Sequence, residues 1–129
     1  MSNLMSKPVG ELLVVDSKRK IVLLIDKIIM LEGRINYTIF HLKDGKKRLY
    51  SHTLHTYEAD LAKHGFIRVH RGFMVNIACV QNYKIEEKMI VMENNLIALV
   101  SRRKGEREEV KILLTKSIGS PRKVLMGKN

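Results

Sequence analysis

Short apolar runs separated by polar turns make up most of the chain. The runs are strand-sized, rich in β-branched and aromatic residues, and bounded by Gly, Asp, Asn and Ser. Such segments are typical of β-strands. The runs that we expect to form strands are Glu11–Val15, Ile21–Ile25, Ile28–Leu31, Tyr37–Leu42, Lys47–Ser51, Phe66–Val69, Val80–Ile85, Met89–Met92 and Leu96–Val100.

Turn-forming residues join several of these runs. Asp44-Gly45 predicts a hairpin turn, because glycine tolerates φ > 0. Glu93-Asn94-Asn95 separates the last two runs, which we expect to form a second hairpin. Asp16–Lys20 reads as a turn between the first two runs. The spacing favours a small sandwich of short antiparallel sheets over a βαβ fold.

One segment, Thr53–Lys63, changes to helical spacing. Its apolar residues recur on one helical face: Leu54, Tyr57 and Leu61. Thr53 can cap the start of this helix, and Gly65 can terminate it.

Two other segments have weaker helical features. Ser101 could cap a final helix that runs to about Leu114, although Gly105 disfavours helix by roughly 1 kcal/mol relative to Ala. His70–Asn76 is less regular than its neighbours and could form one helical turn. We expect one domain over residues 11–114, between a flexible leader over residues 1–10 and a basic flexible tail over residues 115–129.

Charge then narrows the possible partners. The chain has 24 Lys and Arg against 13 Asp and Glu, a formal net charge of +11. Such a charge attracts polyanions, of which nucleic acid is the commonest and anionic membrane the second. Many basic domains are only solvated, so charge alone does not choose between these partners. Apolar residues make up 45% of the chain, which is enough for a core and excludes global disorder.

Redox and membrane features point to the cytoplasm. Cys79 is the only cysteine, so neither an intramolecular disulfide nor a cysteine-based zinc site can form. The first residues lack the apolar core of a signal peptide. No apolar run approaches the roughly 20 residues of a membrane span. We therefore expect a cytoplasmic protein without membrane insertion.

Catalytic constellations are missing from the sequence. His52 and His55 have a metal-ligand spacing, but no third ligand is suggested nearby. Glu86 and Glu87 are adjacent, so on a strand they would point to opposite faces and make a poor acid–base pair. No Gly-rich phosphate loop and no G-x-S-x-G elbow occurs. We expect no enzyme activity, no metal and no organic cofactor.

One candidate cluster for nucleic-acid contact lies within Phe66–Asn76, where Arg68, His70 and Arg71 are enclosed by apolar residues. On a strand, Arg68 and His70 share one face, while Arg71 shares the other with a valine. Arginine can bind guanine O6 and N7 together, and His or Asn can donate to bases or phosphates. The same residues also fit a strand end with solvated charges, and Asn76 fits a buried amide that satisfies backbone groups.

Two further clusters are cationic or polar. Ser101-Arg102-Arg103-Lys104 would place three cations in the first turn of a helix, where the dipole prefers anions. A bound phosphate would remove that conflict, although a frayed, solvated helix start is the alternative. Arg34, Asn36 and Tyr37 lie in an inter-strand loop and can all hydrogen-bond DNA, although these residues alone are better explained as an ordinary polar turn.

In this order, the clusters resemble the LytTR family of bacterial DNA-binding domains. Phe66–Asn76 resembles the family's F-x-R-V-H-R-S-[YF]-x-V-N core, with Gly72 where Ser is common. Ile28–Tyr37 resembles I-x-x-I-E-x-x-x-N-Y, and it is followed by the Asp-Gly hairpin and a T-L-x-x-L-E-x-x-L helix. Leu96–Arg103 resembles [IL]-x-[VI]-S-R-[RK], with Lys104-Gly105 where bulkier residues usually start the last helix.

The resemblance implies a mainly β fold, an elongated sandwich of short antiparallel β-sheets with one or two short helices. It implies loops that enter successive major grooves, with contacts from Asn36 and its neighbours, from Arg71 and His70, and from Arg102 or Arg103. It also implies paired or direct-repeat sites in double-stranded DNA, a possible homodimer on DNA, and an unknown signalling partner. We thus expect a transcription regulator that binds double-stranded DNA sequence-specifically.

Two alternatives stay open on the sequence alone. An RNA-binding module would use the same charge, but aromatic residues total only 5% and form no stretch suited to stacking single-stranded bases. A basic adaptor for proteins or anionic membranes is the other. Competition between duplex DNA, single-stranded RNA and anionic vesicles separates the three.

Overall fold

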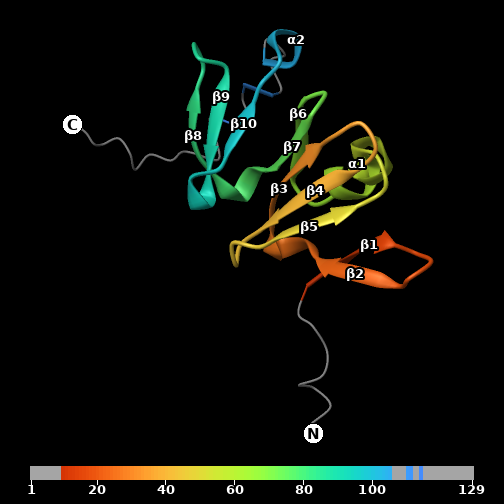
Figure 1. Cartoon of the computed structure of the whole chain (residues 1–129). Helices are drawn as coiled ribbons and strands as arrows, with labels where there is room; N and C mark the ends of the chain where they lie inside the picture. The colour runs from red at the N-terminus through yellow and green to blue at the C-terminus, as the bar shows by residue number, and fades with distance from the viewer. Residues whose placement is uncertain (1–9, 106–109, 112–113, 115–129) are drawn as a thin grey trace, which may run out of the picture.

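The computed structural model describes residues 10–105, 110–111 and 114 (Figure 1). Its strands are β1 (Leu12–Asp16), β2 (Ile21–Leu24), β3 (Ile28–Gly33), β4 (Thr38–Leu42), β5 (Lys47–Tyr50), β6 (Phe66–His70), β7 (Phe73–Asn76), β8 (Val80–Lys84), β9 (Met89–Met92) and β10 (Ile97–Leu99). These described residues form three antiparallel sheets, with the orders β1-β2, β5-β4-β3-β7-β6 and β10-β9-β8. The mainly β fold expected from the sequence is confirmed, and most expected strand bounds differ by only one or two residues.

The five-stranded sheet separates two hydrophobic cores. On β3, Ile28 and Leu31 pack into a core with β1 and the first helix, whereas Ile29 and Met30 pack into a second core with β8, β9 and β10. The register of β3 against β4 shifts between Ile28 and Met30, which changes the simple alternation of faces there. Every residue of β4 is buried, in keeping with its position between β3 and β5.

Helix α1 (Leu54–Ala62) is the helix that the apolar spacing predicts. It buries the three expected residues: Leu54, Tyr57 and Leu61. Thr53 occupies the N-cap position, but its side chain makes no capping hydrogen bond, so the expected side-chain cap is wrong. Gly65 has φ +84°, a left-handed conformation that favours glycine and ends the helical segment as expected.

Both expected hairpins are present. Gly45 has φ +90°, and its N–H donates to the carbonyl of Leu42 at 3.0 Å, which closes the turn between β4 and β5. The turn between β9 and β10 places Asn94 and Asn95 in the left-handed region, with φ of 62° and 59°. Asparagine tolerates that conformation better than most residues.

The helical turn that we considered within His70–Asn76 is wrong, because its second half is strand β7. β7 lies between β3 and β6 and pairs antiparallel with both. Its middle residues fill both cores, Met74 on one face and Val75 on the other. These pairings across the sheet decide the conformation over the irregular local pattern.

The last described element is helix α2 (Arg102–Gly105), which starts directly after Ser101 as expected. Val110 and Leu114 are buried in the second core. Residues 106–109 and 112–113 of the expected last helix lie outside the described residues. So do residues 1–9 of the expected leader and the expected basic tail over residues 115–129.

Candidate nucleic-acid interface

In chain order, the first candidate cluster is Glu32–Tyr37, the second lies within Phe66–Asn76 and the third is Ser101–Lys104. Main-chain hydrogen bonds bring all three to one end of the molecule. The N–H of Gly33, where β3 enters the first loop, donates to the carbonyl of Gly72 in the second loop at 2.9 Å. The N–H of Ser101, the first residue of the third cluster, donates to the carbonyl of Val69 on β6 at 2.9 Å. Figure 1 shows the tip of β6 and β7 beside α2. Clusters that are far apart in the sequence therefore form one surface.

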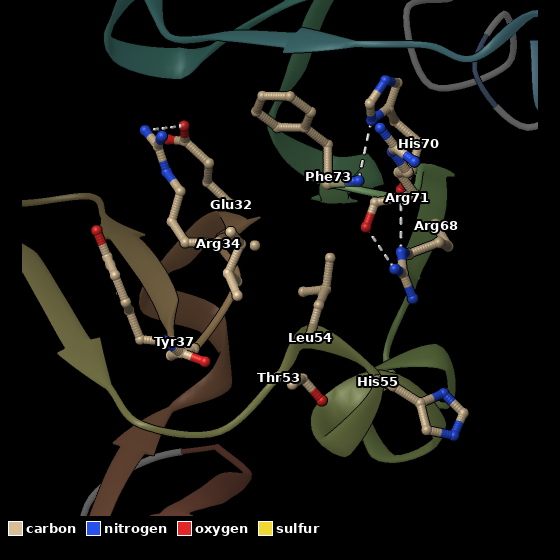
Figure 2. A pocket seen from close by; sticks show the side chains of 14 residues that line it. Glu32, Arg34, Tyr37, Thr53, Leu54, His55, Arg68, His70, Arg71 and Phe73 are labelled. Carbon is tan, nitrogen blue, oxygen red and sulfur yellow. Dashed lines mark hydrogen bonds and ion pairs between the residues drawn. The ribbon is translucent and has the colours of Figure 1, made fainter.

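A hollow of about 920 Å³ separates the first loop from the second. It is lined by residues 32–37, 53–55, 68 and 70–73. Figure 2 shows Arg34 and Tyr37 on one side of the hollow and His70 and Arg71 on the other, with the start of α1 between them. The cationic side chains thus stand on opposite walls of one concave surface.

The first loop is a tight turn with a paired arginine. The N–H of Arg34 donates to the carbonyl of Tyr37 at 2.8 Å, and Ile35 and Asn36 are exposed between them. The guanidinium of Arg34 donates to Glu32 Oε2 at 2.7 Å, and the other oxygen of Glu32 lies 3.1 Å from His41 Nε2. The Arg34 side chain is 51% exposed, so this pair contributes little to stability and can exchange for a phosphate.

The second loop is a two-residue turn, Arg71-Gly72, between β6 and β7. β6 ends at His70, with a register shift between Arg68 and His70. The expected sharing of a face by Val69 and Arg71 is therefore wrong: Val69 is fully buried, whereas Arg71 is exposed in the turn. Among the residues that the structure describes, no group pairs with the Arg71 guanidinium.

Arg68 is held inside the domain. Its side chain is only 18% exposed, and it forms an ion pair of 2.7 Å with Glu58 on α1. Its guanidinium also donates to the carbonyls of His70, at 2.9 Å, and Arg71, at 2.5 Å. All three of its nitrogen atoms are therefore engaged with the protein.

His70 is fixed in one tautomer by the turn. The N–H of Gly72 donates to His70 Nδ1 at 2.9 Å, so Nδ1 is unprotonated and Nε2 carries the hydrogen. Desolvation by burial lowers the pKa of His70 below its usual value, and the charges of Arg71 and Arg68 lower it further. A neutral imidazole therefore offers an Nε2–H donor beside Arg71.

Asn76 lies inside the fold, away from the loops. It is 7% exposed, and its amide NH₂ donates to the carbonyl of Ile28 at 3.0 Å. Its amide oxygen accepts from the N–H of Ala78 at 3.1 Å and caps the 3₁₀ helix Ile77–Cys79. Both ends of the side chain are satisfied, which matches the buried alternative in the sequence analysis.

The third cluster is cationic and exposed where it is described. Arg102 and Arg103 are exposed at the start of α2, and Ser101 is half-buried. The side chain of Lys104 lies outside what the structure describes.

Sequence reasoning missed Glu32, Glu58 and His55. Glu32 and Glu58 hold the two arginines, and His55 lines the hollow with its ring within 3.5 Å of Glu58. Glu32 lies within the first cluster, so its spacing from Arg34 was a usable signal. Nothing local links Glu58 to Arg68, because the two residues meet only through the packing of α1 against β6.

The described part of the chain offers neither a cluster of metal ligands nor a membrane-spanning helix. No group of three or more His, Cys, Asp or Glu side chains comes together there to hold a metal ion. No described helix is long and apolar enough to cross a membrane.

The chain is similar to known proteins both in its sequence pattern and in its fold. The family model of the LytTr DNA-binding domain matches residues 18–111. A solved structure, the LytTr DNA-binding domain of a Bacillus cereus protein described as a methyl-accepting/DNA response regulator, superposes with a TM-score of 0.64 at 21% identity. That likeness covers 81% of this chain and 97% of the other. No curated protein sequence matches the chain.

Proposed function

The chain belongs to the LytTR family of DNA-binding domains, and on that premise we propose that it reads a specific duplex sequence through loops placed in the major groove. Membership supports DNA binding and transcription regulation with double-stranded DNA as the partner. We further propose that residues 11–114 form one domain, which acts in the cytoplasm by binding DNA and without catalysis. Arginine, asparagine and histidine read base edges, while further cations hold phosphates.

The observation that carries this proposal is the position of Arg71 on a fixed turn. Its backbone turn is tied by hydrogen bonds, yet its own guanidinium is exposed and unpaired among the described residues. An arginine on a rigid turn loses little conformational entropy when it binds guanine O6 and N7 together. The neighbouring Nε2–H of His70 supplies a second donor at the same tip.

Other contacts divide between bases and phosphates. In the first loop we assign Asn36 and Tyr37 to bases or backbone and Arg34 to phosphate, after it leaves Glu32. In the third cluster we assign Arg102 and Arg103 to base or phosphate contact.

Four candidates from the sequence receive other roles. Lys104 touches phosphate at most, because an ammonium lacks the planar fork with which an arginine binds a base edge. Arg68 and Asn76 make no contact with DNA, since both side chains are engaged inside the domain. Ser101 fixes the start of the third cluster through its main-chain bond to β6.

Arrangement on DNA is part of the proposal. The family resemblance favours paired or direct-repeat sites, with a homodimer formed on DNA and a separate signalling partner. Half-site spacing in a bound sequence reports the arrangement directly.

Selection of bound duplexes from a random pool tests the function. Enrichment of a common motif is expected, and salt should weaken binding with a slope of about −0.9 in log K per phosphate neutralised. Competition with single-stranded RNA and anionic vesicles should leave the selected duplex bound. A pool that returns no motif, or an affinity that stays flat with salt, would overturn the proposal.

A further inference from the structure

We propose that Glu58 and Arg68 are positioning residues, which together aim Arg71 at DNA. The inference rests on the proposed function and deepens it, since neither residue touches DNA in this scheme. Glu58 holds the Arg68 guanidinium, and Arg68 holds the carbonyls of the turn from which Arg71 projects.

The Arg71-Gly72 turn needs stabilising side-chain contacts because its backbone conformation is not one that favours a two-residue hairpin. Two-residue hairpin turns that match the twist of their strands place at least one residue at positive φ. Neither Arg71 nor Gly72 is among the residues with positive φ. In addition, the register of β6 against β7 shifts just before the turn. A turn of this kind splays its strands unless other groups fix it.

Arg68 fixes it from the inside. Its Nε donates to the carbonyl of His70 at 2.9 Å, and one terminal nitrogen donates to the carbonyl of Arg71 at 2.5 Å. Two parallel donors on a planar guanidinium set the orientation of both peptide groups, which a single ammonium cannot do. With its carbonyl held by Arg68, Arg71 extends its exposed side chain beside His70 and away from the Arg68 guanidinium (Figure 2).

Glu58 in turn fixes Arg68. Its carboxylate accepts from the other terminal nitrogen of Arg68 at 2.7 Å and lies on α1, a separate element from the hairpin. His55 also faces this carboxylate, with Nδ1 at 3.5 Å. Without the carboxylate, Arg68 would have no anionic partner among the described residues, and a nearby phosphate would draw it away from the turn. Glu58 therefore keeps Arg68 on the turn in the presence of DNA.

Glu58→Gln isolates this role when it is compared with Asp60→Asn. Both changes remove one negative charge from α1, but Asp60 is exposed and lines a different hollow, away from Arg68. The readout is the affinity ratio between the duplex most enriched by the wild-type chain and a scrambled duplex of equal composition. Glu58→Gln should narrow that ratio about tenfold, equivalent to ~1.4 kcal/mol, whereas Asp60→Asn should leave it intact.

Arg68→Lys provides a second variant with unchanged net charge. Lysine can still pair with Glu58, but it lacks the fork that holds both carbonyls, so the ratio should narrow while the salt slope stays constant. Thermal unfolding of the free protein shows whether each variant is folded. If Glu58→Gln does not fold, Arg68→Lys tests the same claim alone.

Double variants decide whether the two residues act through Arg71. In an Arg71→Ala background, Glu58→Gln and Arg68→Lys should narrow the ratio no further, because the side chain that they position is gone. If either change narrows the affinity ratio further in the Arg71→Ala background, the inference is overturned. It is also overturned if Glu58→Gln folds and has the same affinity ratio as Asp60→Asn. If the wild-type chain enriches no duplex at all, the proposed function fails instead, so the two failures are distinguishable.

Discussion

Gly33 and Gly72 meet where the first and second loops join, with the Gly33 N–H donating to the Gly72 carbonyl at 2.9 Å. The space around the Cβ position is tight at Gly33 but not at Gly72. A Cβ on Gly33 would lie 3.3 Å from Leu54 Cβ, which is tighter than nine in ten real Cβ contacts. A Cβ on Gly72 would find its nearest neighbour, His70 Nδ1, at 3.4 Å. Packing therefore favours glycine at position 33 but does not require it at position 72.

Gly33→Ala should weaken both the fold and DNA binding. Leu54 Cβ belongs to the rigid start of α1 and cannot swing aside, so β3 and α1 must separate slightly. Overpacking of this kind costs typically 1–3 kcal/mol. Chemical denaturation measures the loss, and the affinity for the selected duplex should fall because the first and second loops shift relative to each other. A stability within error of the wild type would show that the contact relaxes freely.

Gly72→Ser should be tolerated. Gly72 does not have positive φ, and its Cβ position is open enough for ordinary contact, so the serine that is common in the LytTR pattern fits here. We expect a change in unfolding free energy within about 0.5 kcal/mol, as for a surface substitution. The added hydroxyl stands beside Arg71 and should raise affinity for all duplexes alike. A large loss of stability would mean that the turn depends on glycine after all.

Glu32→Gln should release Arg34 for phosphate. The amide keeps the size of the side chain and can still bond His41, but it no longer neutralises the exposed guanidinium. Affinity should therefore rise for selected and scrambled duplexes together, with a salt slope steeper by about one phosphate equivalent. The double variant Glu32→Gln/Arg34→Ala is the control and should lose the gain. A gain confined to the selected duplex would instead assign Arg34 to a base.

Local sequence predicted those parts of the fold whose causes are local. The helical spacing of Leu54, Tyr57 and Leu61 placed α1, and Asp44-Gly45 placed a hairpin, because each pattern fixes backbone conformation within a few residues. β7 was not predicted as a strand, since no turn dipeptide of the usual kind marks Arg71-Gly72. Its strand conformation comes from pairing on both sides, with β6 across a two-residue turn and with β3, which lies far earlier in the chain.

The candidate site divides in the same way. Motif order placed Arg71, His70 and Asn36 in loops, and the structure brings the second of these loops beside the first. Motif order could not assign different roles to Arg68 and Arg71, which lie in one short motif. The roles differ because the carboxylate of Glu58, on another element, pairs with Arg68 and not with Arg71. Glu58 lies ten residues before Arg68, and only the packing of α1 against β6 brings the two side chains together.

Acidification should destabilise the free protein through His70. Its pKa is lowered in the fold, mainly by desolvation, so the unfolded chain binds a proton more readily. Stability from this group is present above the unfolded pKa of about 6.5 and is lost as pH falls towards the lower pKa of the folded state. Protonation also turns Nδ1 into a donor that faces the Gly72 N–H donor. His70→Asn, whose side-chain oxygen can accept from that N–H, should flatten unfolding curves over this range when they are measured without DNA; an unchanged slope would contradict the assignment.

Arg71→Ala and Lys104→Ala should affect DNA binding in different ways. Arg71 projects from a tied turn, so its loss removes a base contact worth about 1–3 kcal/mol and relaxes preference at one position of the site. Lys104 is assigned to phosphate, so its loss should weaken selected and scrambled duplexes alike and reduce the salt slope by about one. Titration of both duplexes at several salt concentrations separates the two signatures, with thermal unfolding to confirm that each variant is folded. A folded Arg71→Ala protein that keeps the full ratio would remove Arg71 from the base-reading set and, with it, the role given to Glu58 and Arg68, while DNA binding by the family fold would stand.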